Sequence, residues 1–398
     1  MKKSLLALAA MSAFATAANA QSSVTLYGVV DLPIEYNNHL APGLNPANVN
    51  ASGIPQSLPG GGSRVGLQTG GGLSGSRWGL RGTEDLGGGL KALFVLESGF
   101  GLDDGKSQQG GRLFGRQAFV GMQSDTLGRV TFGRQYTTMF DMFANFSPTG
   151  YATLYEPVVA QLGTNFRSDN TVKYTAVIGP VTAEAHWSFG TGVSAIGLTP
   201  LAGAGAGEVP GNFNNNAGGG AGLLYLAGPL GLTAAYDEWR PTVTIGSPGR
   251  SRKAGLAGSY TYGPAKIMAG YRYGRVTGSD GTELQRDNYY WIGMNYQVTA
   301  PLGLTLEYAY DDITQLRAPN PVAGGPALAS NNPANPWQIS LVADYNLSKR
   351  TDVYLTMAYV KNSGLNFDTS AVSFANGYFL SQGSNSQVGV AVGMRHKF

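Results

Sequence analysis

The C-terminal stretch SQVGVAVGMRHKF, residues 386–398, alternates residue by residue between apolar and small or polar side chains. One face would carry Val388, Val390, Val392, Met394, His396 and Phe398, and the other Gln387, Gly389, Ala391, Gly393, Arg395 and Lys397. A period of two is typical of a β-strand that has two different environments on its two faces. The same alternation recurs at residues 304–312 and 337–347, so the sequence predicts an all-β fold.

The connections between the expected strands alternate between short and long. Short turns, nearly all with Gly or Pro, fall at 83–89, 124–128, 179–180, 228–231, 262–265, 299–303 and 347–350. Longer segments fall at 37–74, 102–111, 137–164, 191–218, 242–251, 277–286, 316–335 and 362–385. They separate about 16 antiparallel strands, an even number that closes a bacterial barrel with both termini on the side of the short turns. The expected strands are 23–36, 75–83, 90–101, 112–123, 129–136, 165–178, 181–190, 219–227, 232–241, 252–261, 266–276, 287–298, 304–315, 336–346, 351–361 and 386–398.

Alternation also occurs in soluble sandwiches, so the environment must be inferred from the strand ends. Aromatic residues crowd the edges of the apolar faces, as they do where a lipid band meets water: Tyr260, Tyr262, Tyr271, Tyr273, Tyr308, Tyr310 and Tyr359. After the N-terminal segment, no apolar run approaches the roughly 18 to 20 residues that a membrane helix needs. We therefore predict a transmembrane barrel of antiparallel strands.

The N-terminal residues predict export. Lys2 and Lys3 precede an apolar run that ends in the small-residue motif Ala18-Asn19-Ala20, the pattern of a cleaved Sec signal peptide. We expect a signal peptide over residues 1–20 and a single barrel domain over residues 21–398.

Composition excludes several functions. Removing Lys2 and Lys3 lowers the formal charge from +3 to +1, so no electrostatic bias toward nucleic acid is expected. The chain has no cysteine, which excludes disulfides and thiol-bound metals. Its Gly-rich runs lack the strand, helix and Lys context of a phosphate-binding loop and are interpreted as turns. No cofactor is expected.

Several motifs, in order along the chain, resemble those of the general trimeric porins of beta- and gamma-proteobacterial outer membranes, above all the Burkholderia, Bordetella and Neisseria type. They are SSVTLYGVVD at 22–31, GSRWGLRGTEDLGGGLKALFVLESGF at 75–100, GRLFGRQAFVGM at 111–122, TFGRQY at 131–136, DNTVKY at 169–174 and VGMRHKF at 392–398. The resemblance implies a 16-stranded homotrimer of the Gram-negative outer membrane, in contact with lipid and lipopolysaccharide. It also implies passive diffusion of ions and small hydrophilic solutes, a third extracellular loop folded into the lumen, and recognition of Phe398 by the barrel-assembly machinery.

Arginines are expected on one wall of the lumen. Alternation in SRWGLRG places Arg77 and Arg81 inward, and the phase of the family places Arg116, Ala118 and Val120 inward with Phe119 outward. Arg134 and Arg167 flank the third long loop. Because guanidinium groups stay charged, such a set would maintain a permanent field in the narrowest section.

The stretch RQYTTMFDMFANFSPTGYATLYEP, residues 134–157, has the apolar content of a core but the periodicity of neither a helix nor a strand. Bent inward, it could pack its apolar anchors on the inner wall: Met139, Phe140, Met142, Phe143 and Phe146. Its acidic residues, Asp141 and Glu156, would then face the arginines and create a transverse field. Further side chains expected to line the pore are Tyr27, Asp31, Glu97, Tyr136, Glu184 and His186.

Two alternatives to a general porin are considered. A substrate-specific channel for sugars or for one class of anion would need a track such as Tyr27, Tyr136, Tyr151, Tyr155 and Tyr289. A barrel enzyme could use Glu184 and His186 as an acid and base, but no Ser-His-Asp set or His-rich metal group assembles. An excess of inward arginines favours a weak preference for anions. The first loop also repeats a phrase, at Ser63-Arg64 and Ser76-Arg77, whose first copy could extend a strand or remain in the loop.

Overall fold

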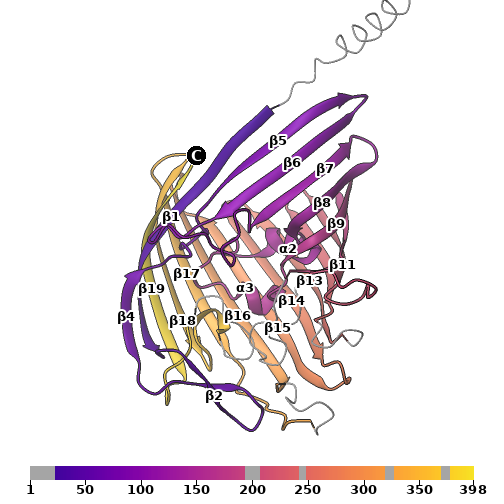
Figure 1. Cartoon of the computed structure of the whole chain (residues 1–398). Helices are drawn as coiled ribbons and strands as arrows, with labels where there is room; N and C mark the ends of the chain where they lie inside the picture. Colours follow the sequence, from indigo (N-terminus) through magenta and orange to yellow (C-terminus); the bar gives the residue numbers. More distant parts are fainter. Residues whose placement is uncertain (1–22, 193–206, 242–247, 319–326, 369–376) are drawn as a thin grey trace, which may run out of the picture.

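The chain closes into one antiparallel barrel (Figure 1). The computed structural model describes residues 23–192, 207–241, 248–318, 327–368 and 377–398; the expected signal peptide lies outside them. The strands are β1 Ser23–Leu40, β2 Leu44–Val49, β3 Pro55–Ser57, β4 Gly62–Leu67, β5 Arg77–Gly87, β6 Leu90–Gly99, β7 Gln117–Ser124, β8 Gly128–Tyr136, β9 Arg167–Ile178, β10 Val181–Ser188, β11 Gly218–Ala227, β12 Leu230–Trp239, β13 Arg250–Tyr262, β14 Ala265–Thr277, β15 Glu283–Gln297, β16 Leu302–Leu316, β17 Trp337–Asn346, β18 Thr351–Lys361 and β19 Ser386–Lys397.

The first long loop contributes to the wall. On one side β1 pairs with β19; on the other its residues 23–29 pair with β5 and its residues 34–40 pair with β4. Because β4 and β5 share one position, the 17 strands of the main sheet fill sixteen positions around the barrel. The sixteen-stranded prediction is confirmed, but residues 37–74 are not wholly loop. The first copy of the repeated Ser-Arg phrase lies at the start of β4 and the second at the start of β5, and both strands pair with β1.

Burial along β19 follows the predicted alternation. Val392 and Met394 are 59% and 53% exposed on the outside, whereas Gln387 and Ala391 are 0% and 1% exposed on the inside. Tyr260, Tyr262 and Tyr308 are exposed on the outer surface as expected. Among the described residues no helix is long and apolar enough to cross a membrane.

The predicted phase of β7 is wrong. Phe119 lines an inner cavity together with Asp141 and Lys173, whereas Val120 is 58% exposed on the outer wall. Ala118 pairs with Leu96, next to the inward Glu97, and so also points outward. The expected strand began at residue 112, but the ladder begins at Gln117. Arg116 precedes that ladder, so its inward direction carries no information on the phase of the residues that follow.

The third long loop folds into the barrel and forms most of the main core with the strands around it. It forms α2 Thr138–Phe143, the 3-10 helix η1 Ala144–Phe146 and α3 Val158–Leu162, and a further 3-10 helix, η3 Leu365–Phe367, packs against it. Figure 1 shows α2 and α3 enclosed by the strands. Short helices were not expected from the periodicity, because each is too short to show one. Four of the five expected anchors are buried, namely Met139, Met142, Phe143 and Phe146. The fifth, Phe140, is partly buried.

Hydrogen bonds from distant strands hold this loop. Trp291 Nε1 donates to the Phe146 carbonyl at 2.8 Å, Gln338 Nε2 to the Tyr155 carbonyl at 2.9 Å, and Arg272 Nε to the Gln161 carbonyl at 3.1 Å. These donors come from β15, β17 and β14. The loop is therefore fastened across the barrel, and carbonyls at the ends of its short helices gain the partners that buried backbone groups require.

Candidate functional site

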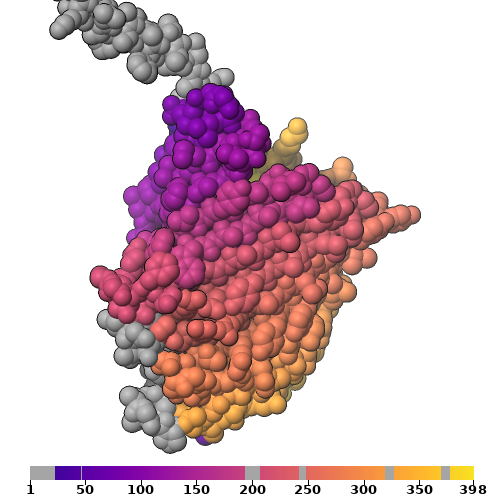
Figure 2. All heavy atoms as spheres, turned by 90° about the vertical axis from the view of Figure 1, so that its right-hand side faces the viewer, coloured from indigo at the N-terminus to yellow at the C-terminus, as the bar shows by residue number. Residues whose placement is uncertain are grey.

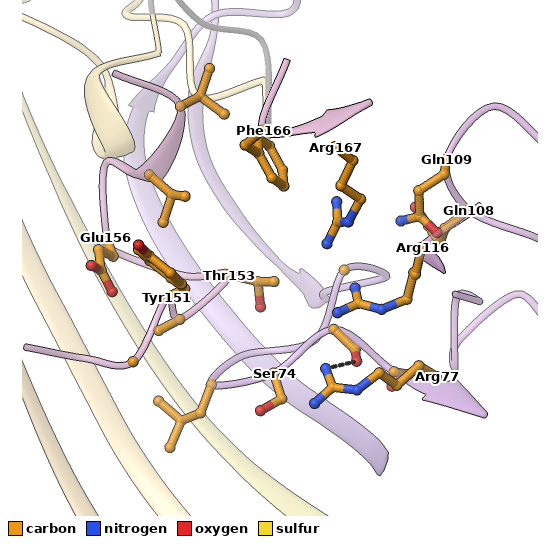
Figure 3. Close-up of a pocket in the computed structure, with 18 of the residues that line it drawn as sticks. Ser74, Arg77, Gln108, Gln109, Arg116, Tyr151, Thr153, Glu156, Phe166 and Arg167 are labelled. Carbon is orange, nitrogen blue, oxygen red and sulfur yellow. Dashed lines mark hydrogen bonds between the residues drawn. The ribbon is translucent and has the colours of Figure 1, made fainter. Parts of the chain in front are cut away.

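A cavity of about 460 Å³ lies between the inner face of the early strands and the third loop. Figure 3 shows Arg77, Arg116 and Arg167 on one side of it and Glu156 on the other, with Tyr151 and Thr153 between them. We call this space the arginine cavity. Gln108 and Gln109 from the second long loop also line it, beside Arg116.

Glu97 on β6 organises two of these arginines. Its carboxylate accepts from Arg116 Nε at 2.7 Å and from the Tyr27 hydroxyl at 3.0 Å, and lies 3.7 Å from Arg77 Nε. One carboxylate thus balances two guanidiniums, and Arg167 adds a third positive charge. The result is a local excess of positive charge on this wall.

Tyr136, the last residue of β8, joins Arg116 to Arg167. Its hydroxyl oxygen accepts from Arg116 Nη2 at 3.1 Å and from Arg167 Nη2 at 3.3 Å. The guanidinium carbon of Arg167 also lies 4.9 Å and 4.6 Å from the ring centroids of Tyr136 and Phe166, respectively. Cation–π attraction and the shared hydroxyl offset the repulsion between the arginines. Because both lone pairs of the hydroxyl are used, its own proton is available to a third acceptor.

Aromatic rings continue from this cluster into the loop. Phe140 stacks on Tyr136 at 3.9 Å between ring centroids and packs on Tyr151 at 4.5 Å. Phe166 lies 5.7 Å from Phe140 on a nearly parallel plane. The loop therefore presses an aromatic wall against the arginines and limits how far their side chains can move.

Glu156, on the far side of the cavity, is almost fully buried, at 3% exposure. Ser147 Oγ donates to its Oε1 at 2.5 Å, and Thr149 Oγ1 donates to its Oε2. Burial nevertheless raises the pKa of Glu156 above its ordinary value. Glu156 thus lies across the cavity from the arginines, and loop hydroxyls hold its carboxylate.

Asp141 lies elsewhere. Lys173 Nζ donates to Asp141 and lies 3.5 Å from Glu184 Oε1, in a second inner cavity of about 390 Å³ that Arg129 also lines. Sequence reasoning missed Lys173, although alternation within DNTVKY places it on the same face as Thr171. Asp141 therefore neutralises a lysine and does not face the arginine cavity.

His186 and Asp31 serve the architecture. His186 Nδ1 accepts from the Thr138 amide at 3.2 Å, which fixes the start of α2, and its Nε2 lies 3.7 Å from Asp237. Asp31 is fully buried and accepts from the Tyr354 hydroxyl at 2.5 Å and from the Ser74 amide at 2.7 Å. Both side chains are buried, and their hydrogen bonds hold loops in place.

Arg81 and Arg134 lie outside the arginine cavity. Arg81 lies four residues beyond Arg77 along β5, roughly 14 Å away at strand spacing, with its guanidinium 5.3 Å from the Tyr27 ring centroid. Arg134 donates from Nε to the Gly115 carbonyl at 2.7 Å and from Nη1 to Asp169 at 2.6 Å. Its register partner is the outward Ala118, in a β7–β8 ladder without a register shift, so alternation along β8 also turns Arg134 away from the inward Gly133 and Gln135. The prediction that all five arginines share one wall is therefore wrong for Arg134.

Other clusters were not expected. Glu35 accepts from the hydroxyls of Tyr155 and Tyr378 at 2.8 Å and 2.7 Å and pairs with Arg64 at 3.3 Å. Arg272, fully buried, pairs with Asp287. Phe398 is 44% exposed on the outside, and its carbonyl accepts from the Gly28 amide at 3.0 Å. In the described part of the chain no group of three or more acidic, His or Cys side chains has the arrangement of a metal site.

A closed antiparallel barrel with an apolar outer wall and a polar interior defines the class of outer-membrane channel proteins. The model of the Gram-negative porin family matches residues 7–365, and the chain belongs to this family of the bacterial outer membrane. It is 34% identical to an outer membrane porin protein of Bordetella pertussis over 100% of both chains.

Two solved structures share the fold. The anion-selective porin from Comamonas acidovorans has a TM-score of 0.70 and 27% identity, covering 95% of this chain and 100% of that one. The trimer form of OmpT from Vibrio cholerae has a TM-score of 0.58 and 15% identity, covering 95% and 99% of the two chains, respectively. The family and the fold are those of channels rather than of enzymes.

Proposed function

We propose that the protein is a general diffusion channel for ions and small hydrophilic solutes, with the arginine cavity as its narrowest section. The observation that carries this proposal is the set of three guanidiniums, Arg77, Arg116 and Arg167, on one wall opposite the third loop. Charged groups in a narrow aqueous section set ion preference. The working subunit assembly would be a homotrimer, as in the trimer form of OmpT.

The same observation favours anions. Glu97 is the one carboxylate bonded to these arginines among the described residues, and the Glu156 carboxylate accepts hydrogen bonds from Ser147 and Thr149 rather than from an arginine. The Comamonas acidovorans relative is described as an anion-selective porin. Both features support a preference for small anions, in line with the excess of arginines.

A sugar-specific channel has less support. Two of the tyrosines that could form an aromatic track, Tyr155 and Tyr289, are 0% and 1% exposed and belong to the core under the loop. The remaining three, Tyr27, Tyr136 and Tyr151, have their hydroxyls bonded to Glu97, to arginines and to the Phe140 carbonyl. These rings are therefore fixed parts of the wall.

The test is current measurement on the protein in planar bilayers under a salt gradient, together with swelling of liposomes in neutral sugars of increasing size. We expect a reversal potential of the sign for anions, and swelling rates that fall smoothly with solute size. A current that one sugar blocks at low concentration would instead favour a substrate-specific channel. If the folded barrel gives no current in planar bilayers, the proposal is rejected.

The remaining partners follow from the family and are part of the proposal. The barrel would contact outer-membrane lipid and lipopolysaccharide, and the barrel-assembly machinery would recognise the C-terminal strand that ends in Phe398. Nucleic acid is not an expected partner, and no cofactor is needed for diffusion.

A further inference from the structure

Four arginines lie at the loop ends of neighbouring strands on the outer wall, at positions that diffusion through the lumen does not use. Glu238 on β12 pairs in register with Arg252 on β13, which pairs with Arg275 on β14, which pairs with Arg286 on β15. Residues paired across a ladder point to the same side of the sheet. Tyr236, two residues before Glu238, is 42% exposed on the outer wall, so this row also points outward. Arg240 completes what we call the arginine row.

Two glutamates organise the arginine row without neutralising it. Glu238 accepts from Arg240 Nε at 2.7 Å and from Arg252 Nε at 2.9 Å. Glu283 lies 2.7 Å from Arg275 Nε and 3.5 Å from Arg286 Nε. Four positive charges thus share two negative ones, and three of the arginine side chains are 39% to 46% exposed.

The three exposed arginines have hydrogen-bond donors that the described part of the chain does not use. In the described part of the chain, Arg252, Arg275 and Arg286 bond only through Nε. Their terminal Nη groups therefore remain available, and a fork of guanidinium N–H groups suits the oxygens of a phosphate. Because the glutamates bind Arg252 and Arg275 through Nε, the terminal Nη groups of these arginines are left for an anion.

An apolar groove of about 710 Å³ begins next to the arginine row, on the same strands. Figure 2 views the side of the molecule on which β11 and β13 lie. Ala254 and Tyr273 in the groove are each two residues from an arginine of the row, roughly 7 Å along the strand. Small side chains form the floor and larger ones the borders: Ala183, Ala185, Ala221, Ala234 and Ala254, with Tyr174, Leu223, Leu256, Tyr271 and Tyr273. We call it the alanine groove.

We propose that the arginine row and the alanine groove together bind a phosphorylated lipid of the outer leaflet, an inference that rests on the lipid contact in the proposed function and assigns it a site. An acyl chain would lie in the groove, whose volume is within the range of about 300–1,000 Å³ typical of ligand sites, and the phosphate would bind the Nη groups of Arg252 and Arg275. Charge complementarity selects a phosphate, and the adjoining apolar groove selects a lipid over free phosphate. Tyrosines on both borders suit the interface between acyl chains and head groups.

The test is native mass spectrometry of the folded, detergent-solubilised assembly after incubation with bisphosphorylated lipid A or with its dephosphorylated form. The double variant R252Q/R275Q should bind the phosphorylated lipid about 30-fold more weakly, since each cation near an anionic head group contributes a factor of about five. Its binding of the dephosphorylated lipid should not change. The variant A234F, which fills the groove, should weaken both lipids.

The matched control is K349Q/R350Q, which removes the same charge from a short turn at the opposite end of the barrel. It should bind both lipids as the wild type does. Equal binding of the phosphorylated lipid by R252Q/R275Q would overturn the proposal. Full displacement of the lipid by millimolar inorganic phosphate would overturn the proposal by assigning the row to free anions. Loss of the trimer in either variant would also overturn it, by assigning this wall to subunit contacts.

Discussion

Arg167 is the residue on which the proposed anion preference depends most. Its guanidinium lies beside two aromatic rings and one hydroxyl, and its Nε has no hydrogen-bond partner among the described residues. Unlike Arg116 and Arg77, it has no carboxylate within salt-bridge distance in the part of the chain that the structure describes. Its charge is therefore the least balanced of the three arginines in the cavity.

We expect Arg167→Gln to reduce the permeability ratio of anions over cations roughly fivefold, the equivalent of about 1 kcal/mol for one charge at about 4 Å in water. Reversal potentials in a salt gradient measure this ratio. The matched control is Arg134→Gln, which removes the same charge at a position bonded to Asp169 outside the cavity. Equal effects of the two substitutions would contradict the placement of the narrow section.

Glu156 should make selectivity and stability depend on pH. Because burial raises its pKa above 4.5, the protonated form is favoured in the folded state. The folded protein then binds more protons than the unfolded chain, so the free energy of unfolding falls as pH rises from about 4.5 through the raised pKa. Over the same interval Glu156 becomes charged, and the preference for anions should decrease.

Glu156→Gln removes both effects, because a glutamine side chain does not titrate. We expect reversal potentials and urea unfolding of this variant to be flatter with pH than those of the wild type across that interval. Asp141→Asn should keep the wild-type slope of selectivity, since Asp141 faces Lys173 in a different cavity. If the slope disappears in Asp141→Asn and persists in Glu156→Gln, the pH dependence belongs to Asp141 and the prediction is wrong.

At the scale of elements, α2 depends on the strands that leave room for it. Gly222 on β11 and Gly255 on β13 face the helix: a Cβ would lie 2.6 Å from Met142 Cγ and 2.8 Å from Phe143 Cζ, respectively. Ordinary side chains at these two positions would collide with the loop anchors. Glycine is thus what allows a helix to pack directly on the inner wall of a barrel.

Gly255→Val should displace Phe143 and with it α2, which changes the width of the lumen. We expect single-channel conductance to change and current noise to increase. A Cβ at this position would also lie 2.7 Å from the Tyr271 carbonyl oxygen, so β14 must shift as well. Gly258→Val is the control, since its nearest neighbour would lie at 3.4 Å and is an outer-wall leucine. Unaltered conductance in Gly255→Val would show that the loop does not limit the current.

Phe143 itself should contribute packing like that of a soluble core, because it is fully buried. Phe143→Ala is expected to lower the free energy of unfolding by about 3–5 kcal/mol, from the lost apolar contact and the cavity that remains. Urea unfolding followed by tryptophan fluorescence reports this directly, since Trp291 lies 5.5 Å from Phe143 between ring centroids. Leu306→Ala, on the outer wall, should cost much less.

At the scale of the whole molecule, the third loop and the barrel wall form one cooperative unit. Strands β10, β14, β15 and β17 each bond to it, and the first loop joins it through Thr153, whose hydroxyl donates to the Gly72 carbonyl at 2.9 Å. The wall and the loop should therefore unfold together in one transition, because the loop is bonded to strands on several sides of the barrel.

A homotrimer should show three equal conductance steps for each insertion into a planar bilayer. The assembly should also migrate as a trimer in gentle detergent and as a monomer after heating. Single steps from a particle of monomer mass would contradict trimeric assembly while leaving the family assignment intact.

The sequence alone determined the all-β class, the closure into a barrel and the position of most strands. This was possible because a period of two, turn residues and aromatic edges are local properties that reflect which face of each strand meets lipid. The family motifs then indicated the inward third loop, whose apolar residues Met142 and Phe143 proved to be the core.

Only the tertiary structure decided which charged groups meet. The Tyr136 hydroxyl joins Arg116 and Arg167, which are 20 and 31 residues away in the sequence, whereas Arg134, two residues from Tyr136, points elsewhere. A bulge near Gly133, the late start of β7 and the short helices of the loop set these directions. Each one-residue shift reverses the face of a strand, and because it arises from contacts between distant segments, no local pattern encodes it.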